Sequence, residues 1–173
     1  MNFGLSKGIT DGNAFEARTV TLNPRVNFTY EYGERLIINP SYQFTRNITE
    51  YTNYVVNAAT NNLHRVNLQT TLFWPTNWVF GNDFGYTYNS NIADGFRKDF
   101  YLWNTSLAYS FYQKRFTAKV KVYDVMNQNQ NATRTITATA IRDEENVVLR
   151  RYVMFSLTYK LAPLDKEKQK GRL

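Results

Sequence analysis

The chain has 173 residues, enough for one domain, and its lack of cysteine excludes a disulfide scaffold. Aromatic residues make up 16% of it, which excludes a disordered segment. The formal charge of +7 is dispersed along the chain rather than clustered, so we expect no nucleic-acid partner. No run of about 20 apolar residues could form a transmembrane helix, and residues 1–11 lack the apolar core of an export signal.

Residues 20–32 alternate strictly between apolar and polar side chains, which predicts a strand with one apolar and one polar face. The apolar positions are Val20, Leu22, Pro24, Val26, Phe28, Tyr30 and Tyr32. The alternation resumes at residues 36–45, after Gly33 and Glu34. The two segments are therefore predicted to form a hairpin with a tight turn.

The same period of two continues to the end of the chain. Further strands are predicted at residues 65–74, 77–88, 101–111, 116–122 and 153–161. Seven strands result, and those at 20–32, 77–88 and 101–111 alternate for about 11 to 13 residues, longer than the five or six of an ordinary strand. About 9 to 11 residues suffice to cross a bilayer at a tilt, so these lengths suit transmembrane strands.

The connections fall into two classes. Short turns after Tyr32, Trp74 and Phe111 alternate with longer polar links at 49–62, 89–98 and 127–146. Transmembrane barrels have this asymmetry, with short periplasmic turns and long external loops. We therefore predict an all-β fold, made of about 7 to 8 long antiparallel strands of a transmembrane β-barrel that is part of a larger barrel.

Alternation alone also fits a soluble lipocalin-like barrel that binds a small apolar ligand. Two further features favour lipid. The polar face is rich in Asn, Thr, Ser and Gln, which suits a water-filled or plugged lumen. Aromatic residues gather near the short-turn rim (Tyr30, Tyr32, Trp74, Trp78, Phe111, Tyr112 and Tyr159) and toward the long-loop rim (Tyr51, Tyr86, Tyr88, Tyr101 and Trp103), like two interfacial girdles.

This interpretation assigns individual residues to the two faces. Val26, Phe28, Leu68, Phe84, Leu107, Val120 and Leu157 are expected to face lipid. Asn27, Asn67, Asp83, Ser106, Lys119 and Ser156 are expected to face the lumen.

Three segments carry a resemblance to a known family: residues 99–111 (DFYLWNTSLAYSF), 123–130 (YDVMNQNQ) and 149–161 (LRRYVMFSLTYKL). They resemble the outer-membrane β-barrel family at the C-terminus of TonB-dependent receptors. In that family a barrel of about 22 strands surrounds an N-terminal plug, and energy from the inner membrane drives uptake of siderophores, glycans or peptides. The resemblance implies a location in the cell outer membrane and a role in solute transport.

The chain differs from that family in having no plug or energy-coupling segment and about a third of the strands. We therefore expect the C-terminal barrel fragment of a TonB-dependent receptor. Residues 1–19 are expected to be a loop or the remnant of a preceding strand around Phe3 and Leu5, residues 20–161 the barrel segment, and residues 162–173 a charged periplasmic tail. Expected partners are outer-membrane lipid, the remainder of the barrel with its plug domain, and the barrel assembly machinery.

Little in the sequence points to catalysis. His64 is the only histidine and cysteine is absent, so a Cys/His metal cluster is excluded and any Ser-His arrangement would depend on His64. We interpret His64 as a rim residue at the start of a strand. We expect no enzyme activity, no catalytic or metal-binding residues and no cofactor.

Charged and polar side chains give the remaining candidates. The lumen-facing candidates are Arg25, Glu31, Arg35, Arg65, Asp83, Lys119 and Lys121, which are expected to pair with one another or with a plug, or else to line a solute path. Asp124 and Asn127 are expected to cap a strand end by Asx-type hydrogen bonds. Phe155, Leu157, Tyr159 and Leu161 form an alternating C-terminal strand that is expected to act as an assembly signal.

Overall fold

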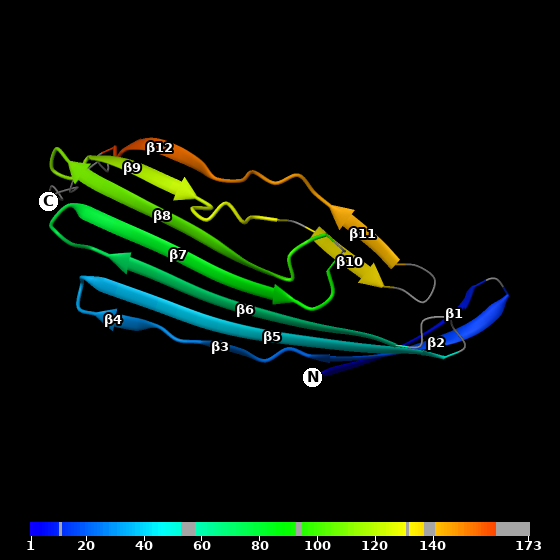
Figure 1. Cartoon of the computed structure of the whole chain (residues 1–173). Coiled ribbons are helices and arrows are strands. Elements are labelled where there is room, and N and C mark those ends of the chain that lie inside the picture. The colour runs from blue at the N-terminus through cyan, green and yellow to red at the C-terminus, as the bar shows by residue number, and fades with distance from the viewer. Residues whose placement is uncertain (11, 53–57, 93–94, 131, 137–140, 162–173) are drawn as a thin grey trace, which may run out of the picture.

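The computed structural model describes residues 1–10, 12–52, 58–92, 95–130, 132–136 and 141–161, and in this part the chain is all-β (Figure 1). The strands are β1 (Asn2–Thr10), β2 (Asn13–Leu22), β3 (Arg25–Asn27), β4 (Tyr30–Tyr32), β5 (Leu36–Thr52), β6 (Ala58–Leu72), β7 (Trp78–Asn89), β8 (Asp99–Phe111), β9 (Phe116–Tyr123), β10 (Ala132–Ile136), β11 (Ile141–Glu145) and β12 (Tyr152–Tyr159). Within these described ranges, no helix is long and apolar enough to cross a membrane.

Sequential antiparallel pairing builds one large sheet in the order β1-β2-β5-β6-β7-β8-β9-β12. The short strands β3 and β4 also pair with β5, in the register that β2 sets, so β2, β3 and β4 act as one interrupted strand. β10 and β11 form a separate hairpin, seen in Figure 1 away from the long strands. In the described part of the chain, β1 and β12 end this order, and β3 and β4 also have a strand neighbour on one side only.

The sheet has eight long strands, in agreement with the predicted 7 to 8, and the strand beyond the seven counted from the alternation is β1, which pairs with β2. One sequence prediction needs correction. The expected link at 49–62 is mostly strand, since β5 continues to Thr52 and β6 begins at Ala58. Asn and Thr made this segment look like a loop, but paired strands accept polar side chains wherever both faces meet water. The predicted tail at 162–173 lies outside the described residues.

The register places the alternating residues in rows across the sheet. One row on the apolar face runs through Tyr32, Leu36, Leu72, Phe80, Leu107, Val120 and Phe155. A row on the opposite face runs through Asn39, Gln69, Asp83 and Asn104. We call these the outward face and the polar face. The pairing confirms that the residues expected to face lipid lie together on the outward face. It also confirms that the residues expected to face the lumen lie together on the polar face.

The sheet buries almost no apolar core. The buried hydrophobic residues in the described ranges are Ala17, Ile92 and Ala132, whereas Val26 is 65% exposed and Leu157 67% exposed. A soluble domain of this size buries most of its apolar surface, and an exposed apolar face of this extent marks a site of interaction with lipid or protein. The soluble lipocalin-like alternative therefore finds no support.

Aromatic rings gather at both ends of the outward face, as the sequence predicted. At the short-turn rim Trp78, Tyr109, Phe111, Phe116 and Tyr159 form a continuous chain of ring contacts, with centroids 4.7 to 6.1 Å apart. Toward the other rim the contacts join Phe44, His64 and Tyr88, and separately Phe84, Tyr86 and Tyr101. Two predicted members do not belong to this second girdle. Tyr51 lies on the polar face of β5, and Trp103 lies in the row of Leu68, nearer the middle of the outward face.

Candidate functional site

The polar face brings three of the seven charged candidates together. Asp83, Lys119 and Lys121 line one shallow hollow of about 210 Å³ at the middle of the sheet. Its other walls include Asn39, Gln69, Thr71, Asn104 and Ser106. Gly81 forms part of its floor, where an added Cβ would lie 2.7 Å from the Ser106 hydroxyl oxygen. Because Gly81 has no side chain, this part of the hollow stays open. Carboxylate, ammonium, hydroxyl and amide groups all border it.

The other four candidates lie apart from this hollow. Arg25 and Arg65 share a row, each opposite Gln43 of β5. Glu31 lies in β4, opposite Ile37. Arg35 lies in the short turn between β4 and β5, where it helps to line an open hollow of about 1010 Å³ at the short-turn rim.

No ion pair joins any two of the seven charged candidates in the part of the chain that the structure describes, so the expected pairing among themselves is not found there. Instead, Arg25 donates a hydrogen bond to Asn27 Oδ1 at 2.9 Å, and the Lys121 ammonium lies 4.1 Å from the centre of the Tyr123 ring. The second contact is a cation–π interaction. These charges remain available to a solute or to another protein segment.

Neutral side chains on the same face form short cross-strand hydrogen bonds. Asn23 Oδ1 accepts from both Gln43 Nε2 and Thr45 Oγ1 at 2.9 Å. The hydroxyls of Ser110 and Thr117 lie 3.0 Å apart. Such pairs stabilise neighbouring strands and satisfy polar groups without burying charge. On the polar face, neutral side chains therefore hydrogen-bond to one another across strands, and the charged side chains lie between them.

The connection from β9 to β12 begins with a tight turn held by Asp124. This side chain is 1% exposed, and its two carboxylate oxygens accept hydrogen bonds from the backbone N–H groups of Gln128 and Asn129. Asn127 Oδ1 accepts from the backbone N–H of Arg151 at 3.4 Å. Both Asp124 and Asn127 have positive φ, of 50° and 54°. Asp124 therefore caps the turn, but through N–H groups four and five residues on rather than by the predicted Asx-type bond, and Asn127 contacts a residue 24 positions away instead of capping the strand end.

Beyond the turn, the connection reaches across the polar face. The Tyr51 hydroxyl on β5 donates to the carbonyl of Ile136 at the end of β10, at 3.3 Å. Within the hairpin, the Arg134 guanidinium donates hydrogen bonds to both carboxylate oxygens of Asp143, at 2.7 and 2.8 Å. The hydrogen bond from Arg134 holds the pKa of Asp143 below its ordinary value. The hairpin therefore overhangs the polar face at the long-loop end.

The sequence did not predict the contact between Tyr51 and Ile136 or the ion pair between Arg134 and Asp143. Thr133 and Thr135 suit a strand, but Arg134 breaks the apolar–polar alternation of residues 132–136, and nothing in the sequence relates Tyr51 to a carbonyl 85 residues away. The same connection forms one side of a pocket of about 450 Å³. Its walls include Phe96, Arg97, Gln128, Gln130, Glu145 and Arg150.

His64 occupies a different place from the one predicted. It is the seventh residue of β6 rather than the first, and its ring lies on the outward face. Nδ1 is 2.9 Å from the Tyr42 hydroxyl, and the Phe44 ring centre is 4.8 Å away. Within the described ranges, no group of three or more His, Asp or Glu side chains could hold a metal ion.

Three comparisons with known proteins add to this geometry. A family model described as an outer membrane protein beta-barrel family matches residues 10–159, which cover most of the chain. No curated protein matches significantly, and no solved structure does.

Proposed function

The chain belongs to an outer membrane protein β-barrel family and resides in the cell outer membrane, and from this premise we propose that it forms the C-terminal part of the barrel wall of a TonB-dependent receptor that imports a solute. Membership itself suggests a structural or transport protein rather than an enzyme. In this proposal the outward face meets lipid and the polar face lines the solute path. The polar hollow bordered by Asp83, Lys119 and Lys121 is the observation that carries it.

The charges on the polar face support passage of a polar solute. In barrels of this kind, lumen side chains tune selectivity, whereas the same charges on the lipid face would destabilise the barrel. Asp83, Lys119 and Lys121 present both signs around one hollow, with neutral hydrogen-bonding groups between them. This combination suits a solute with hydroxyl, amide or charged groups, and it equally suits contact with a plug.

The sheet edges support a larger assembly. β1 and β12 each have one strand neighbour among the described residues, so each offers unpaired backbone N–H and C=O groups along its other side. Such groups cost several kcal/mol each in hydrocarbon. We propose that further strands of the receptor pair with both edges and that a plug domain fills the enclosed lumen.

Single cysteines test the assignment of the faces, and the natural chain has no cysteine to interfere. In outer-membrane vesicles, cysteine at Asp83 or Lys119 should react with a water-soluble thiol reagent, because both positions would meet the aqueous lumen. Cysteine at the neighbouring Phe84 or Val120 should react only with a lipid-soluble reagent. Equal labelling of both pairs by the water-soluble reagent would contradict the proposed wall.

Liposome swelling tests the role in transport. Residues 1–173 alone, reconstituted in liposomes and exposed to small sugars, should show no swelling, because an open sheet encloses no pore. A general porin in parallel liposomes provides the positive control. Flux through the isolated chain would show that it forms an independent pore and would contradict its role as part of a larger receptor.

We further propose that β12 acts as the signal for the barrel assembly machinery. Phe155, Leu157, Tyr159 and Leu161 are 76%, 67%, 50% and 80% exposed, so this alternating edge is accessible. Replacing both Tyr159 and Leu161 by alanine should reduce the amount of protein inserted in the outer membrane, whereas deleting residues 162–173 should not. The reverse result would show that the tail carries the signal.

A further inference from the structure

Three connections at the long-loop end line the pocket of about 450 Å³ beside the turn at Asp124. Residues 95–97 come from the link between β7 and β8, residues 127–130 follow β9, and residues 145–148 and 150 lead from β11 toward β12. None of these residues borders the hollow at Asp83, so the pocket is a separate place on the molecule.

Four consecutive amide side chains at residues 127–130 border the pocket, and the first two are held by their oxygen atoms. Asn127 Oδ1 accepts a hydrogen bond from the backbone N–H of Arg151 at 3.4 Å. Gln128 Oε1 accepts one from the backbone N–H of Tyr101 at 3.2 Å. The NH₂ groups of these two amides have no hydrogen-bond partner in the described part of the chain, so both can donate to a ligand.

The next two amides are held the other way round. Asn129 Nδ2 donates to the carbonyl of Leu149 at 3.1 Å, and Gln130 Nε2 donates to the carbonyl of Arg97 at 2.7 Å. Among the described residues, the oxygens of these two side chains have no partner, so both can accept from a ligand. The backbone thus fixes all four amides and leaves two donors and two acceptors.

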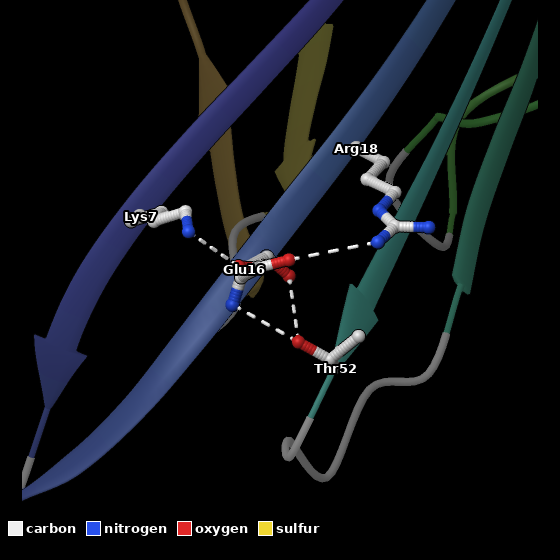
Figure 2. Close-up of polar contacts among 4 residues, drawn as sticks. All are labelled: Lys7, Glu16, Arg18 and Thr52. Carbon is white, nitrogen blue, oxygen red and sulfur yellow. Dashed lines mark hydrogen bonds and ion pairs between the residues drawn. The ribbon is translucent and has the colours of Figure 1, made fainter.

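The charges of the pocket are also unpaired, unlike those at the far end of β2. There Glu16 lies between Lys7 and Arg18, at 2.8 and 3.7 Å, as Figure 2 shows. Within the described ranges, three charged residues of the pocket form no ion pair: Arg97, Glu145 and Arg150. Both signs of charge are therefore available, and a neutral polar ligand can use them.

Phe96 adds an apolar surface to this polar pocket. It is half-buried and forms part of the wall. Binding pockets commonly combine an aromatic side chain with a few fixed polar groups that orient the ligand. A sugar ring has the matching chemistry, because its hydroxyls lie around the edge and its C–H bonds form an apolar face.

We propose that this pocket binds the sugar rings of a neutral oligosaccharide that arrives from outside the cell. Each hydroxyl both donates and accepts hydrogen bonds, so it fits the free NH₂ groups of Asn127 and Gln128 and the free oxygens of Asn129 and Gln130. Phe96 packs against the C–H face of a ring. This inference rests on the proposed role in solute import and names the class of solute.

A panel of fluorescent neutral oligosaccharides, titrated with the full chain in polyoxyethylene detergent micelles, tests the proposal, because this detergent has no sugar headgroup. At least one oligosaccharide should bind saturably. Phe96→Ala should weaken that binding at least about tenfold, since a buried aromatic ring dominates a contact of this size. Phe96→Trp keeps a ring and should retain binding. Failure of the whole panel to bind, or equal binding by the alanine variant, would overturn the proposal.

Gln128→Glu tests the polar groups. Glutamate keeps an oxygen for the Tyr101 N–H but lacks the free NH₂ donor, so binding should fall about two- to tenfold, the value of one neutral hydrogen bond. Gln113→Glu, the same substitution in the short turn between β8 and β9, is the matched control and should bind like the unmodified chain. Equal binding by both variants, with Tyr101 still protected from amide exchange, would contradict the proposal. If that protection is lost, Phe96→Ala decides.

A further variant separates this inference from the proposed function. If Asp83→Asn abolishes oligosaccharide binding and Phe96→Ala does not, the solute binds in the central hollow. The pocket assignment then fails while the proposed role in import stands. Cysteine labelling of the two faces tests the barrel wall independently of any oligosaccharide.

Discussion

The outward face carries different side chains at its short-turn end and at its long-loop end. On the short-turn side it carries rows of apolar and aromatic residues, with Leu107 and Val120 directly opposite each other. On the long-loop side it carries ion pairs such as Lys7–Glu16. The strand period and the pairing continue without interruption between the two ends. The backbone therefore repeats one pattern, and only the outward side chains change along it.

The largest effect should come from a charge placed in the apolar part of that face. Leu68→Arg should destabilise the folded barrel by about 2 to 4 kcal/mol, because Leu68 lies near the middle of the outward face of β6 and arginine is costly at the bilayer midplane. Its neighbour Asn67 lies on the polar face, so Asn67→Arg should cost much less. Denaturant titration of the larger barrel in lipid vesicles measures both. Equal costs would remove the distinction between the faces.

A smaller, local effect is expected in the loops. Asp124→Ala removes a buried side chain that accepts two backbone hydrogen bonds, so it loosens the turn while the strands keep their pairing. Amide hydrogen exchange at Gln128 and Asn129 should accelerate strongly, while exchange in β6 stays unchanged. Asn127→Ala, which removes one long hydrogen bond, is the matched control and should change exchange less. If both variants exchange alike, the turn is not held by Asp124.

The smallest effect should be a pH dependence of the β10–β11 hairpin. Arg134 lowers the pKa of Asp143 below its ordinary value of 3.8, so the ion pair stabilises the folded hairpin fully above that value. This stabilisation is lost as the pH falls through the lowered pKa, when Asp143 takes up a proton. Amide exchange in β10 should therefore accelerate in acid once intrinsic rates are corrected. Asp143→Asn should remove the pH dependence, and an unchanged profile would exclude this ion pair as its cause.

Alternation was sufficient to predict seven of the eight long strands and which face each of their residues occupies. Successive side chains of a strand point to opposite faces, so the face of a residue such as Asn67 is fixed once its strand is recognised. The extent of β5 and β6 could not be predicted in the same way. Beyond Ile48 both faces are mainly polar, and residues 49–52 then look like part of the predicted link at 49–62. His64 was misplaced for the same reason. Its strand was expected to begin at about residue 65, whereas β6 begins at Ala58.

The candidate site was predictable in part. The period placed Asp83 and Lys119 on the polar face, but not in the same hollow, because that depends on the register between β7, β8 and β9. The capping role of Asp124 followed from local chemistry. The contact between Tyr51 and Ile136 depends on how a long connection folds back, and no local signal contains that information.

One hydrogen bond on the outward face gives the protein a built-in optical probe. The indole N–H of Trp103 on β8 donates to Asn82 Oδ1 on the neighbouring strand β7, so a polar amide on the apolar face is satisfied within the sheet. The other two tryptophans, Trp74 and Trp78, lie at the short-turn rim. Trp103 fluorescence should consequently be quenched by bromine atoms deep in the acyl chains, and that of the other two by bromine near the headgroups. The depth of the sheet in a membrane can thus be read without any attached label.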